Sequence, residues 1–302
     1  MSLKCAVIDL GSNSARLGIY NKAESGQIVP VSAFRYTSRL SEGLAKGNLL
    51  TQPAMERTLI AFKEFKAEID KHDKIMVKCV ATEALRRAEN SDFFIGLVKQ
   101  ETGISIEILS GEQEAMYGLF GAKMSTKCDS FYMLDTGGGS FELALCENGF
   151  LKHHTSLPYG AVVMTEKYNP DKLGNEKLYS FIKDVFDEIT WAEKNNIPVV
   201  LLGGSNRVLG KIYGMEENKP YQEGLTIKTE NLKNIMDNII SLSPAEREKI
   251  PGMEKGRVDI INAGLAPLYA LLEKSGAPYV IISTNSIREG IAYEILNKKT
   301  AL

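Results

Sequence analysis

The sequence is poor in the residues that build zinc modules and disulfide scaffolds. Its 302 residues include four cysteines, three histidines and one tryptophan. The cysteines form no CxxC pair, and the histidines lack the spacing of a zinc site. Three cysteines lie in apolar, strand-like runs, which is typical of buried, reduced thiols. A compact fold must therefore come from an ordinary hydrophobic core.

Long apolar runs and a charge excess are also missing. No run approaches the roughly 20 apolar residues of a membrane span. The net charge of −2 gives no bulk attraction to nucleic acid or to a membrane. The first residues, MSLKCAVIDLG, enter a strand pattern at once, so no signal peptide is expected. We expect a cytoplasmic protein with neither a membrane nor a nucleic-acid partner.

The composition is that of a globular α/β protein. Hydrophobic residues make up 44% and charged residues 25% of the chain, and its length favours two domains. Period-2 and period-3.6 patterns alternate along the sequence. They predict strands at 4–10, 15–20, 27–36, 75–80, 104–108, 131–134, 141–146, 150–156, 198–202 and 279–283. Helices are predicted at 51–71, from Ser91 as a cap, at 112–123, 176–195, after 203, and at 229–241, 259–274 and 287–296, with a loop at 214–226.

One short pattern occurs twice. DLGSNSARL begins at Asp9, and DTGGGSFEL begins at Asp135. Each copy ends a strand in an aspartate, passes through a tight glycine-containing turn and starts a second strand. Two matched copies predict two related domains, each with the same turn.

The paired turns have the composition of phosphate sites. Glycine allows backbone N–H groups to point into one concavity that holds an anion, and serine and asparagine add donors. An aspartate at the preceding strand end can bind Mg²⁺, which neutralises phosphate oxygens. Ordinary hairpin turns are the alternative, but the duplication favours a functional role. The predicted phosphate-binding residues are Gly11, Ser12, Asn13, Ser14, Gly137, Gly138, Gly139 and Ser140.

Hydrolysis also requires a group that activates water, and a carboxylate can serve. The candidates are Glu142, after the second turn, and Glu112 and Glu114 at the start of a predicted helix. Helix-start glutamates are also explained by favourable interaction with the helix dipole. Arg86 and Arg87 are candidate phosphate ligands because guanidinium suits bidentate contacts. Solvated helix arginines are the alternative for that pair.

Together these segments resemble the exopolyphosphatase / guanosine pentaphosphate phosphohydrolase family, of the actin / sugar kinase / heat-shock-70 superfamily. The resemblance covers nearly the whole chain. It rests on AVIDLGSNSARL, RLSEGLAKGNLL, VATEALRRAEN, ILSGEQEA, LDTGGGSFEL, SLPYGAVVMTEKY, LLGGSNRVLG and SIREGIAYEIL.

The resemblance implies a fold and a reaction. It implies two RNase H-like domains, 1–124 and 125–286, with a phosphate-binding cleft between them and a helix at 287–302 that packs back onto the first. The substrate would be polyphosphate or guanosine pentaphosphate, and the protein a homodimer. Glu114 would be the catalytic base and Arg86 the functional arginine. Asp135 and Glu142, with Asp9, would hold Mg²⁺ or, as the alternative, Mn²⁺; Glu142 would thus also be catalytic.

Two departures accompany the resemblance. Gln113 stands where the family often has a second acid before the alanine. Longer members carry a further C-terminal helical region that this sequence lacks, so shorter polyphosphates or nucleotides are expected substrates. A small-molecule kinase of the same superfamily and a non-catalytic sensor of guanosine tetra- or pentaphosphate stay open as alternatives.

Overall fold

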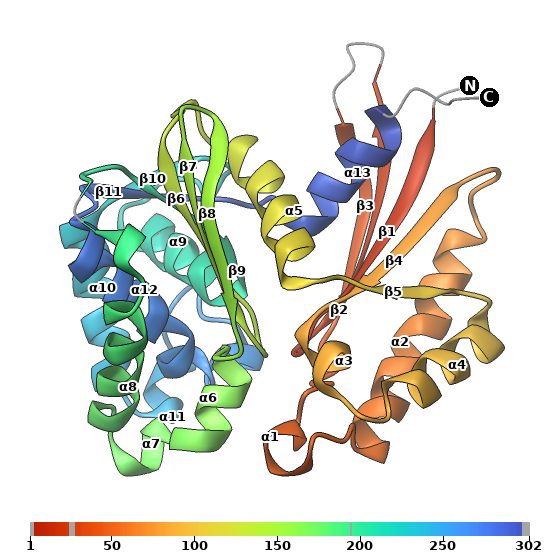
Figure 1. Ribbon diagram of the computed structural model, residues 1–302, viewed down its shortest axis with the longest axis horizontal. Helices are drawn as coiled ribbons and strands as arrows, with labels where there is room; N and C mark the ends of the chain where they lie inside the picture. Colours follow the sequence, from red (N-terminus) through yellow and green to blue (C-terminus); the bar gives the residue numbers. More distant parts are fainter. Residues whose placement is uncertain (1–2, 24–27, 194, 298–302) are drawn as a thin grey trace. The chain divides into compact units, whose positions relative to one another are not determined.

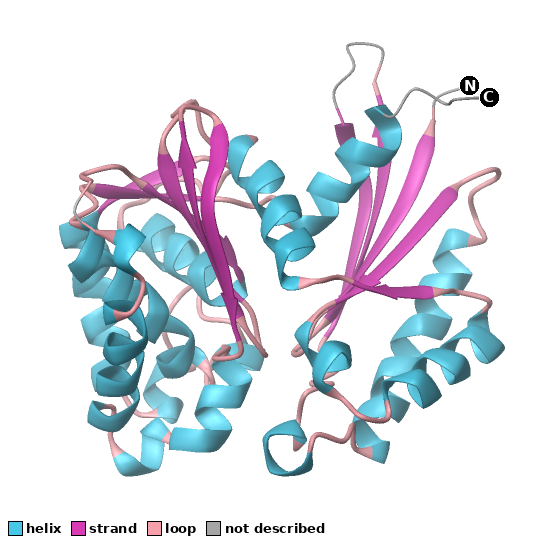
Figure 2. Cartoon of the chain, in the orientation of Figure 1, coloured by secondary structure: helices cyan, strands magenta, loops and turns pink. Residues whose placement is uncertain are grey.

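The computed structural model describes residues 3–23, 28–193 and 195–297, which form two compact units. Unit 1 runs up to Tyr117 and resumes at Ile287, whereas unit 2 is the continuous segment Gly118–Ser286. The first boundary therefore lies inside a helix, ahead of the residue 124 expected from the sequence. Figure 1 shows the elements of both units, and Figure 2 distinguishes strands from helices by colour.

Unit 1 contains a five-stranded mixed sheet in the order β3-β2-β1-β4-β5. Strands β1, β2 and β3 form antiparallel pairs, and β4 and β5 join in parallel. The strands are β1 (Lys4–Leu10), β2 (Ala15–Lys22), β3 (Ile28–Tyr36), β4 (Met76–Ala81) and β5 (Ile106–Ile108). The helices are α1 (Leu44–Gly47), α2 (Gln52–Ile69), α3 (Glu83–Arg87), α4 (Ser91–Thr102), α5 (Gly111–Lys123, shared with unit 2) and α13 (Ile287–Asn297).

Both faces of this sheet are covered. Helix α2 begins with proline in its first turn and buries a stripe that includes Ala54, Phe62 and Phe65. Together with α4 it packs on one face, where β1 contributes Ile8 and Leu10. Helix α13 packs on the other face (Figure 1), in a cluster that joins its own apolar side chains to β1. The C-terminal helix thus completes the core of the N-terminal unit.

Unit 2 has a six-stranded mixed sheet in the order β10-β11-β9-β6-β7-β8. Its strands are β6 (Phe131–Thr136), β7 (Phe141–Glu147), β8 (Phe150–Leu157), β9 (Val199–Gly203), β10 (Leu225–Lys228) and β11 (Tyr279–Ile282). Its α-helices are α6 (Ala161–Tyr168), α7 (Pro170–Leu173), α8 (Glu176–Asp187), α9 (Gly204–Glu216), α10 (Thr229–Ser241), α11 (Pro244–Arg247) and α12 (Ile261–Ser275). Two 3₁₀ turns, η1 (Thr190–Ala192) and η2 (Lys255–Arg257), complete it.

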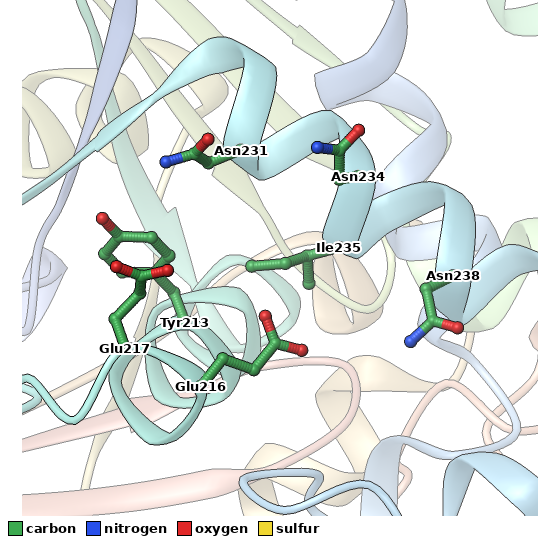
Figure 3. Close-up of a pocket in the computed structure, with 7 residues that line it drawn as sticks. All are labelled: Tyr213, Glu216, Glu217, Asn231, Asn234, Ile235 and Asn238. Carbon is green, nitrogen blue, oxygen red and sulfur yellow. The ribbon is translucent and has the colours of Figure 1, made fainter.

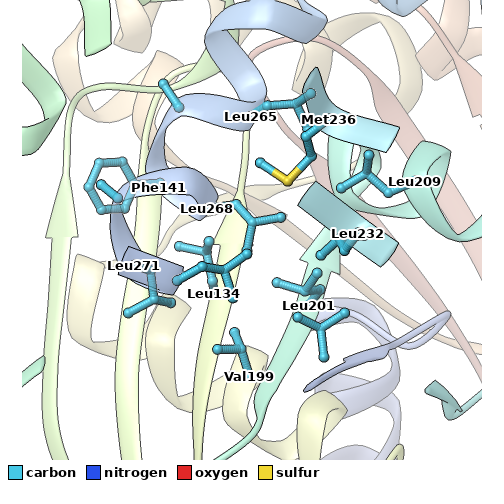
Figure 4. Packing of buried hydrophobic residues seen from close by; sticks show 14 of the residues in the cluster. Leu134, Phe141, Val199, Leu201, Leu209, Leu232, Met236, Leu265, Leu268 and Leu271 are labelled. Carbon is cyan, nitrogen blue, oxygen red and sulfur yellow. The ribbon is translucent and has the colours of Figure 1, made fainter. Parts of the chain in front are cut away.

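The main core of unit 2 lies between the sheet and its helices. Figure 4 shows Leu265, Leu268 and Leu271 of α12 beside sheet residues such as Leu134 and Leu201, all fully or almost fully buried. Helix α5 covers the opposite face through buried apolar residues such as Leu119. Both faces of this sheet are therefore covered by helices.

The sequence repeat is a structural repeat. Asp9 on β1 lies opposite Arg16 on β2, and Asp135 on β6 lies opposite Glu142 on β7 in the same register. In each unit the first strand also pairs in parallel with the strand that follows the three antiparallel strands, β4 or β9. The prediction of two related α/β domains is confirmed.

The helix predicted at 176–195 is wrong at its C-terminal end. Helix α8 ends at Asp187, and the chain turns through η1 instead. The hydroxyl of Tyr132 donates to the carbonyl oxygens of Trp191 and Glu193, at 3.2 and 3.0 Å. A buried tyrosine hydroxyl needs such partners. The chain leaves helical geometry at Ile189, with φ −87° and ψ 79°, and its path through η1 brings these carbonyls to the hydroxyl. Tertiary packing therefore overrides the apolar period here.

Two smaller predictions differ from the structure, and a third lies outside the residues that it describes. Helix α4 has Asn90, not Ser91, at its N-cap, and the Asn90 side chain binds the backbone N–H and C=O of Leu50 at 2.8 and 3.0 Å. The loop predicted at 214–226 is shorter, because α9 reaches Glu216 and β10 begins at Leu225. Gln27 and residues 298–302, which were assigned to a strand and to the last helix, lie outside the described residues.

Candidate functional site

The two predicted phosphate turns are each closed by an equivalent backbone hydrogen bond. The backbone N–H of Gly11 donates to the carbonyl oxygen of Ser14 at 3.1 Å, and that of Gly137 donates to Ser140 at 3.0 Å. Each bond closes the turn between the two antiparallel strands of its hairpin. The matched sequences therefore fold into matched turns.

In unit 1 the segment after β3 fixes the carbonyl groups of the turn. The N–H of Ser41 donates to the carbonyl oxygen of Ser12 at 3.1 Å, and the N–H of Arg39 donates to that of Asn13 at 3.0 Å. These carbonyl dipoles are thereby held by the protein. An anion approaching the turn would otherwise be repelled by them, so this arrangement favours anion binding.

The side chains of the same turn hold unsatisfied polar atoms. Ser12 and Asn13 are only 3% and 4% exposed, yet the Ser12 hydroxyl and both polar atoms of the Asn13 amide find no hydrogen-bond partner among the described residues. A buried polar group without a partner costs about 1–3 kcal/mol. Such a cluster beside a glycine turn is what a polar ligand would satisfy.

In unit 2 the start of helix α6 plays the corresponding part. The N–H groups of residues 160–162 donate to the carbonyl oxygens of Gly137–Gly139 at 2.9–3.0 Å. The approach is so close that a Cβ on Gly160 would lie 2.5 Å from the backbone nitrogen of Ser140. The first N–H groups of α6 are thus used by the turn itself, which leaves the amides of residues 138–140 as the candidate donors for an anion.

Two predicted acids of unit 2 lie side by side. Asp135 and Glu142 are direct cross-strand neighbours in the antiparallel β6–β7 pair, which places their Cβ atoms about 4.5–5.5 Å apart. Glu142 is 2% exposed, and its Oε1 accepts hydrogen bonds from the hydroxyls of Ser140 at 2.6 Å and Ser156 at 2.8 Å. At Gly203 a Cβ would come within 2.6 Å of an Asp135 oxygen, so only glycine fits there without displacing the carboxylate.

This pair of carboxylates fits a magnesium ion of the phosphate-bound type. Mg²⁺ is usually held by one or two carboxylates and completes its shell with water and substrate phosphates. In the described part of the chain, no group of three or more His, Cys, Asp or Glu side chains is arranged to hold a metal. A metal at Asp135 and Glu142 would therefore take its remaining ligands from water and from the substrate. Mg²⁺ at this site stays a prediction.

Glu114 and Arg86 form the second group, in unit 1. Glu114 is 5% exposed on the first turn of α5, and its carboxylate accepts a hydrogen bond from Arg86 Nη2 at 3.2 Å. Arg86 also donates to the carbonyl oxygen of Leu109 at 2.6 Å and, through Nε and Nη2, to Glu83 at 3.1 and 2.7 Å. Burial opposes the charge of Arg86, but Glu114 and Glu83 outweigh it, and its pKa is raised. Arg86 is therefore a paired cation rather than a solvated helix arginine.

The start of α5 separates the two candidate glutamates. Glu112 is exposed, whereas Glu114 is buried against Arg86. Gln113 accepts a hydrogen bond from the backbone N–H of Ser110 at 2.9 Å, and its own N–H donates to the Ser110 hydroxyl at 3.2 Å. This is a capping box, so the residue that departs from the family pattern fixes the helix start. The geometry favours Glu114 over Glu112 as the reactive carboxylate.

Asp9 lies in a charged environment of unit 1 that includes Arg288, a residue missed by the sequence analysis. Arg288, on α13, is 8% exposed, and its Nη2 lies 3.6 Å from a Glu289 oxygen. Burial works against its charge, but Glu289, the Tyr20 hydroxyl and Asp9 outweigh it and raise its pKa. Glu83 and Ser156 were also missed. Only Glu83 left a sequence signal, the i,i+3 spacing to Arg86.

A separate polar hollow lies elsewhere on unit 2. Figure 3 shows it between α9 and α10, lined by Tyr213, Glu216, Glu217, Asn231, Asn234, Ile235 and Asn238. It contains no residue that the sequence analysis predicted for the site.

In the described part of the chain, no helix has both the length and the apolar character to cross a membrane.

Solved structures share this fold. The family member from Aquifex aeolicus is 27% identical, with a TM-score of 0.82 and coverage of 100% of both chains. An exopolyphosphatase from Cytophaga hutchinsonii has a TM-score of 0.88 over 97% of this chain and 98% of that one, at 21% identity. The second likeness concerns the fold alone.

Sequence relatives point the same way. The chain is 30% identical to the guanosine-5′-triphosphate,3′-diphosphate pyrophosphatase of Pseudoalteromonas translucida, over 96% of this chain and 59% of that protein. It is 28% identical to the bifunctional 3-dehydroquinate synthase/phosphatase of Fusobacterium nucleatum, over 97% of this chain and 47% of that protein. The chain thus spans roughly half of each relative. The model of the Ppx/GppA phosphatase family matches residues 19–299. This chain belongs to the Ppx/GppA phosphatase family.

Proposed function

We propose that this protein is a metal-dependent phosphohydrolase that removes the terminal phosphate of inorganic polyphosphate or guanosine pentaphosphate. The observation that carries the proposal is the duplicated turn, closed by the same hydrogen bond in both units and held through its carbonyl groups. One turn also carries buried polar atoms without a partner among the described residues. In each unit, a turn of this kind favours an anionic ligand. The name of the Pseudoalteromonas translucida relative supports the nucleotide as one such substrate.

In the proposed reaction, Glu114 accepts a proton from water. The water oxygen forms a bond to the terminal phosphorus, and the bond from that phosphorus to the bridging oxygen breaks. The products are inorganic phosphate and a chain shortened by one phosphoryl group. Arg86 orients Glu114 through the 3.2 Å contact and adds positive charge near the reacting group.

The turns contribute positioning in this proposal. Amide donors at residues 12–14 and 138–140 bind phosphoryl oxygens and hold the phosphoryl group in place. Positioning of this kind is a main part of catalysis in phosphoryl transfer. Asp135 and Glu142 would hold the metal, with Asp9 as the third predicted acid, and Mn²⁺ is the alternative to Mg²⁺. When bound, the metal would supply charge neutralisation of phosphate oxygens.

The test is phosphate release from long polyphosphate, tripolyphosphate and guanosine pentaphosphate, with and without Mg²⁺. We expect Glu114→Gln to lower turnover by about 10²–10⁴-fold, the usual contribution of a general base. Glu112→Gln is the matched control, because it makes the same change at an exposed position two residues away. Wild-type turnover in Glu114→Gln would refute the assigned base.

The same assay separates the alternatives. Phosphoryl transfer from ATP to an added acceptor, without release to water, would identify a kinase. Tight binding of guanosine pentaphosphate without turnover would identify a sensor. The predicted homodimer is tested by measuring the molar mass of the protein by light scattering after size-exclusion chromatography.

A further inference from the structure

Glu83 is a buried acid that the proposed reaction does not yet use. It is the first residue of helix α3, immediately after β4, and is 7% exposed. Its Oε2 accepts two hydrogen bonds from one guanidinium, from Arg86 Nη2 at 2.7 Å and Nε at 3.1 Å. A second cation, Arg87, lies 3.9 Å from its other oxygen. A buried carboxylate with this arrangement is an anchor for Arg86.

The distances rank the contacts of Arg86. Its shortest bonds go to the Leu109 carbonyl, at 2.6 Å, and to Glu83, at 2.7 Å, and its bond to Glu114 is longer, at 3.2 Å. Bonds on three edges of a planar guanidinium fix its orientation. Glu83 and Leu109 thus hold the plane of Arg86, and Glu114 accepts a hydrogen bond from Nη2, the same nitrogen that binds Glu83.

We propose that Glu83 is a positioning residue for the Arg86–Glu114 pair, an inference that rests on the proposed function of Glu114. Its charge also divides the electrostatic pull of the guanidinium between two carboxylates. Without Glu83, Arg86 keeps the Leu109 carbonyl as an anchor on one nitrogen, and the orientation of the guanidinium beside Glu114 is no longer fixed. Loss of Glu83 therefore acts on the chemical step rather than on substrate binding.

The experiment compares Glu83→Gln, Glu83→Asp and Glu89→Gln in the phosphate-release assay. Glu89→Gln is the matched control, an identical change at an exposed residue six positions along the chain. We expect Glu83→Gln to lower kcat by about 10- to 100-fold with KM within about two-fold of wild type, as misplaced catalytic groups do. Glu83→Asp keeps the charge and should recover part of the lost kcat.

Two results would overturn the inference. One is a kcat within two-fold of wild type in folded Glu83→Gln. The other is an equal loss in both Glu83 variants with a raised KM, which would indicate a packing role. If Glu83→Gln does not fold, the kcat and KM of Glu83→Asp decide alone. Glu114→Gln is run beside them: if it keeps full turnover, the proposed base is wrong, whereas an inactive Glu114→Gln with unchanged Glu83 variants refutes only the role of Glu83.

Discussion

The backbone N–H of Gly160 donates a hydrogen bond to the carbonyl oxygen of Gly139 at 3.0 Å. The start of α6 thus packs directly on the second phosphate turn. A side chain at position 160 would meet the backbone of Gly138 and Ser140 at 2.5 Å. The turn can keep this backbone conformation only because residue 160 is a glycine.

We predict that Gly160→Ala lowers phosphate release by at least about 10-fold, because the added methyl group displaces the amides that bind phosphate. It should also destabilise the protein by roughly 1–3 kcal/mol, the usual effect of overpacking. Turnover and thermal unfolding measure the two effects. Gly96→Ala is the control, since a Cβ there meets nothing within 4 Å and alanine favours helix α4. Wild-type turnover in Gly160→Ala would show that the turn tolerates displacement.

Substitution of Arg247 should lower the free energy of unfolding strongly. This 2% exposed guanidinium donates to Asp171 at 2.7 Å and to the carbonyl oxygen of Ile239 at 2.8 Å. Removing one partner of a buried pair costs about 3–5 kcal/mol, so Arg247→Ala should strongly lower the urea midpoint. The exposed pair of Lys183 and Asp187, at 2.6 Å, is the comparison. Lys183→Ala should leave the midpoint nearly unchanged, and similar shifts in the two variants would contradict this ranking.

The cysteines should differ in reactivity. Burial raises the pKa of the Cys5 thiol to about 12 and also raises those of Cys79 and Cys146. At pH 8 a thiol with that pKa is ionised only on the order of 10⁻⁴, and the thiolate is the reactive form. We expect a thiol reagent to modify half-buried Cys128 first in the native protein, and all four after unfolding in guanidinium. Peptide mapping checks the order, and rapid native labelling of Cys5 would be the opposite result.

The hairpins were predictable because the repeat that encodes them is local. Asp9 and Asp135 are each the penultimate residue of a strand before a glycine turn, and the pairing of the next strand follows from that short sequence. The end of α8 was not predictable, because it depends on a hydroxyl of Tyr132 more than 50 residues away. The contact of Arg86 with Glu114 likewise requires the fold, since 28 residues separate the two. Family resemblance indicated both residues but not the hydrogen bonds between Arg86 and Glu83.

Unit 1 is assembled from two distant stretches of chain, and this sets an order for its biosynthesis. Strand β1 leaves the ribosome long before residues 287–297, which supply the helix that packs on Cys5 and Val7. Unit 2 is continuous and has its segments together earlier. The face of the N-terminal sheet that α13 covers therefore stays without this helix until residues 287–297 have been synthesised, and a chain stalled before Ile287 would present that apolar surface to chaperones or to aggregation.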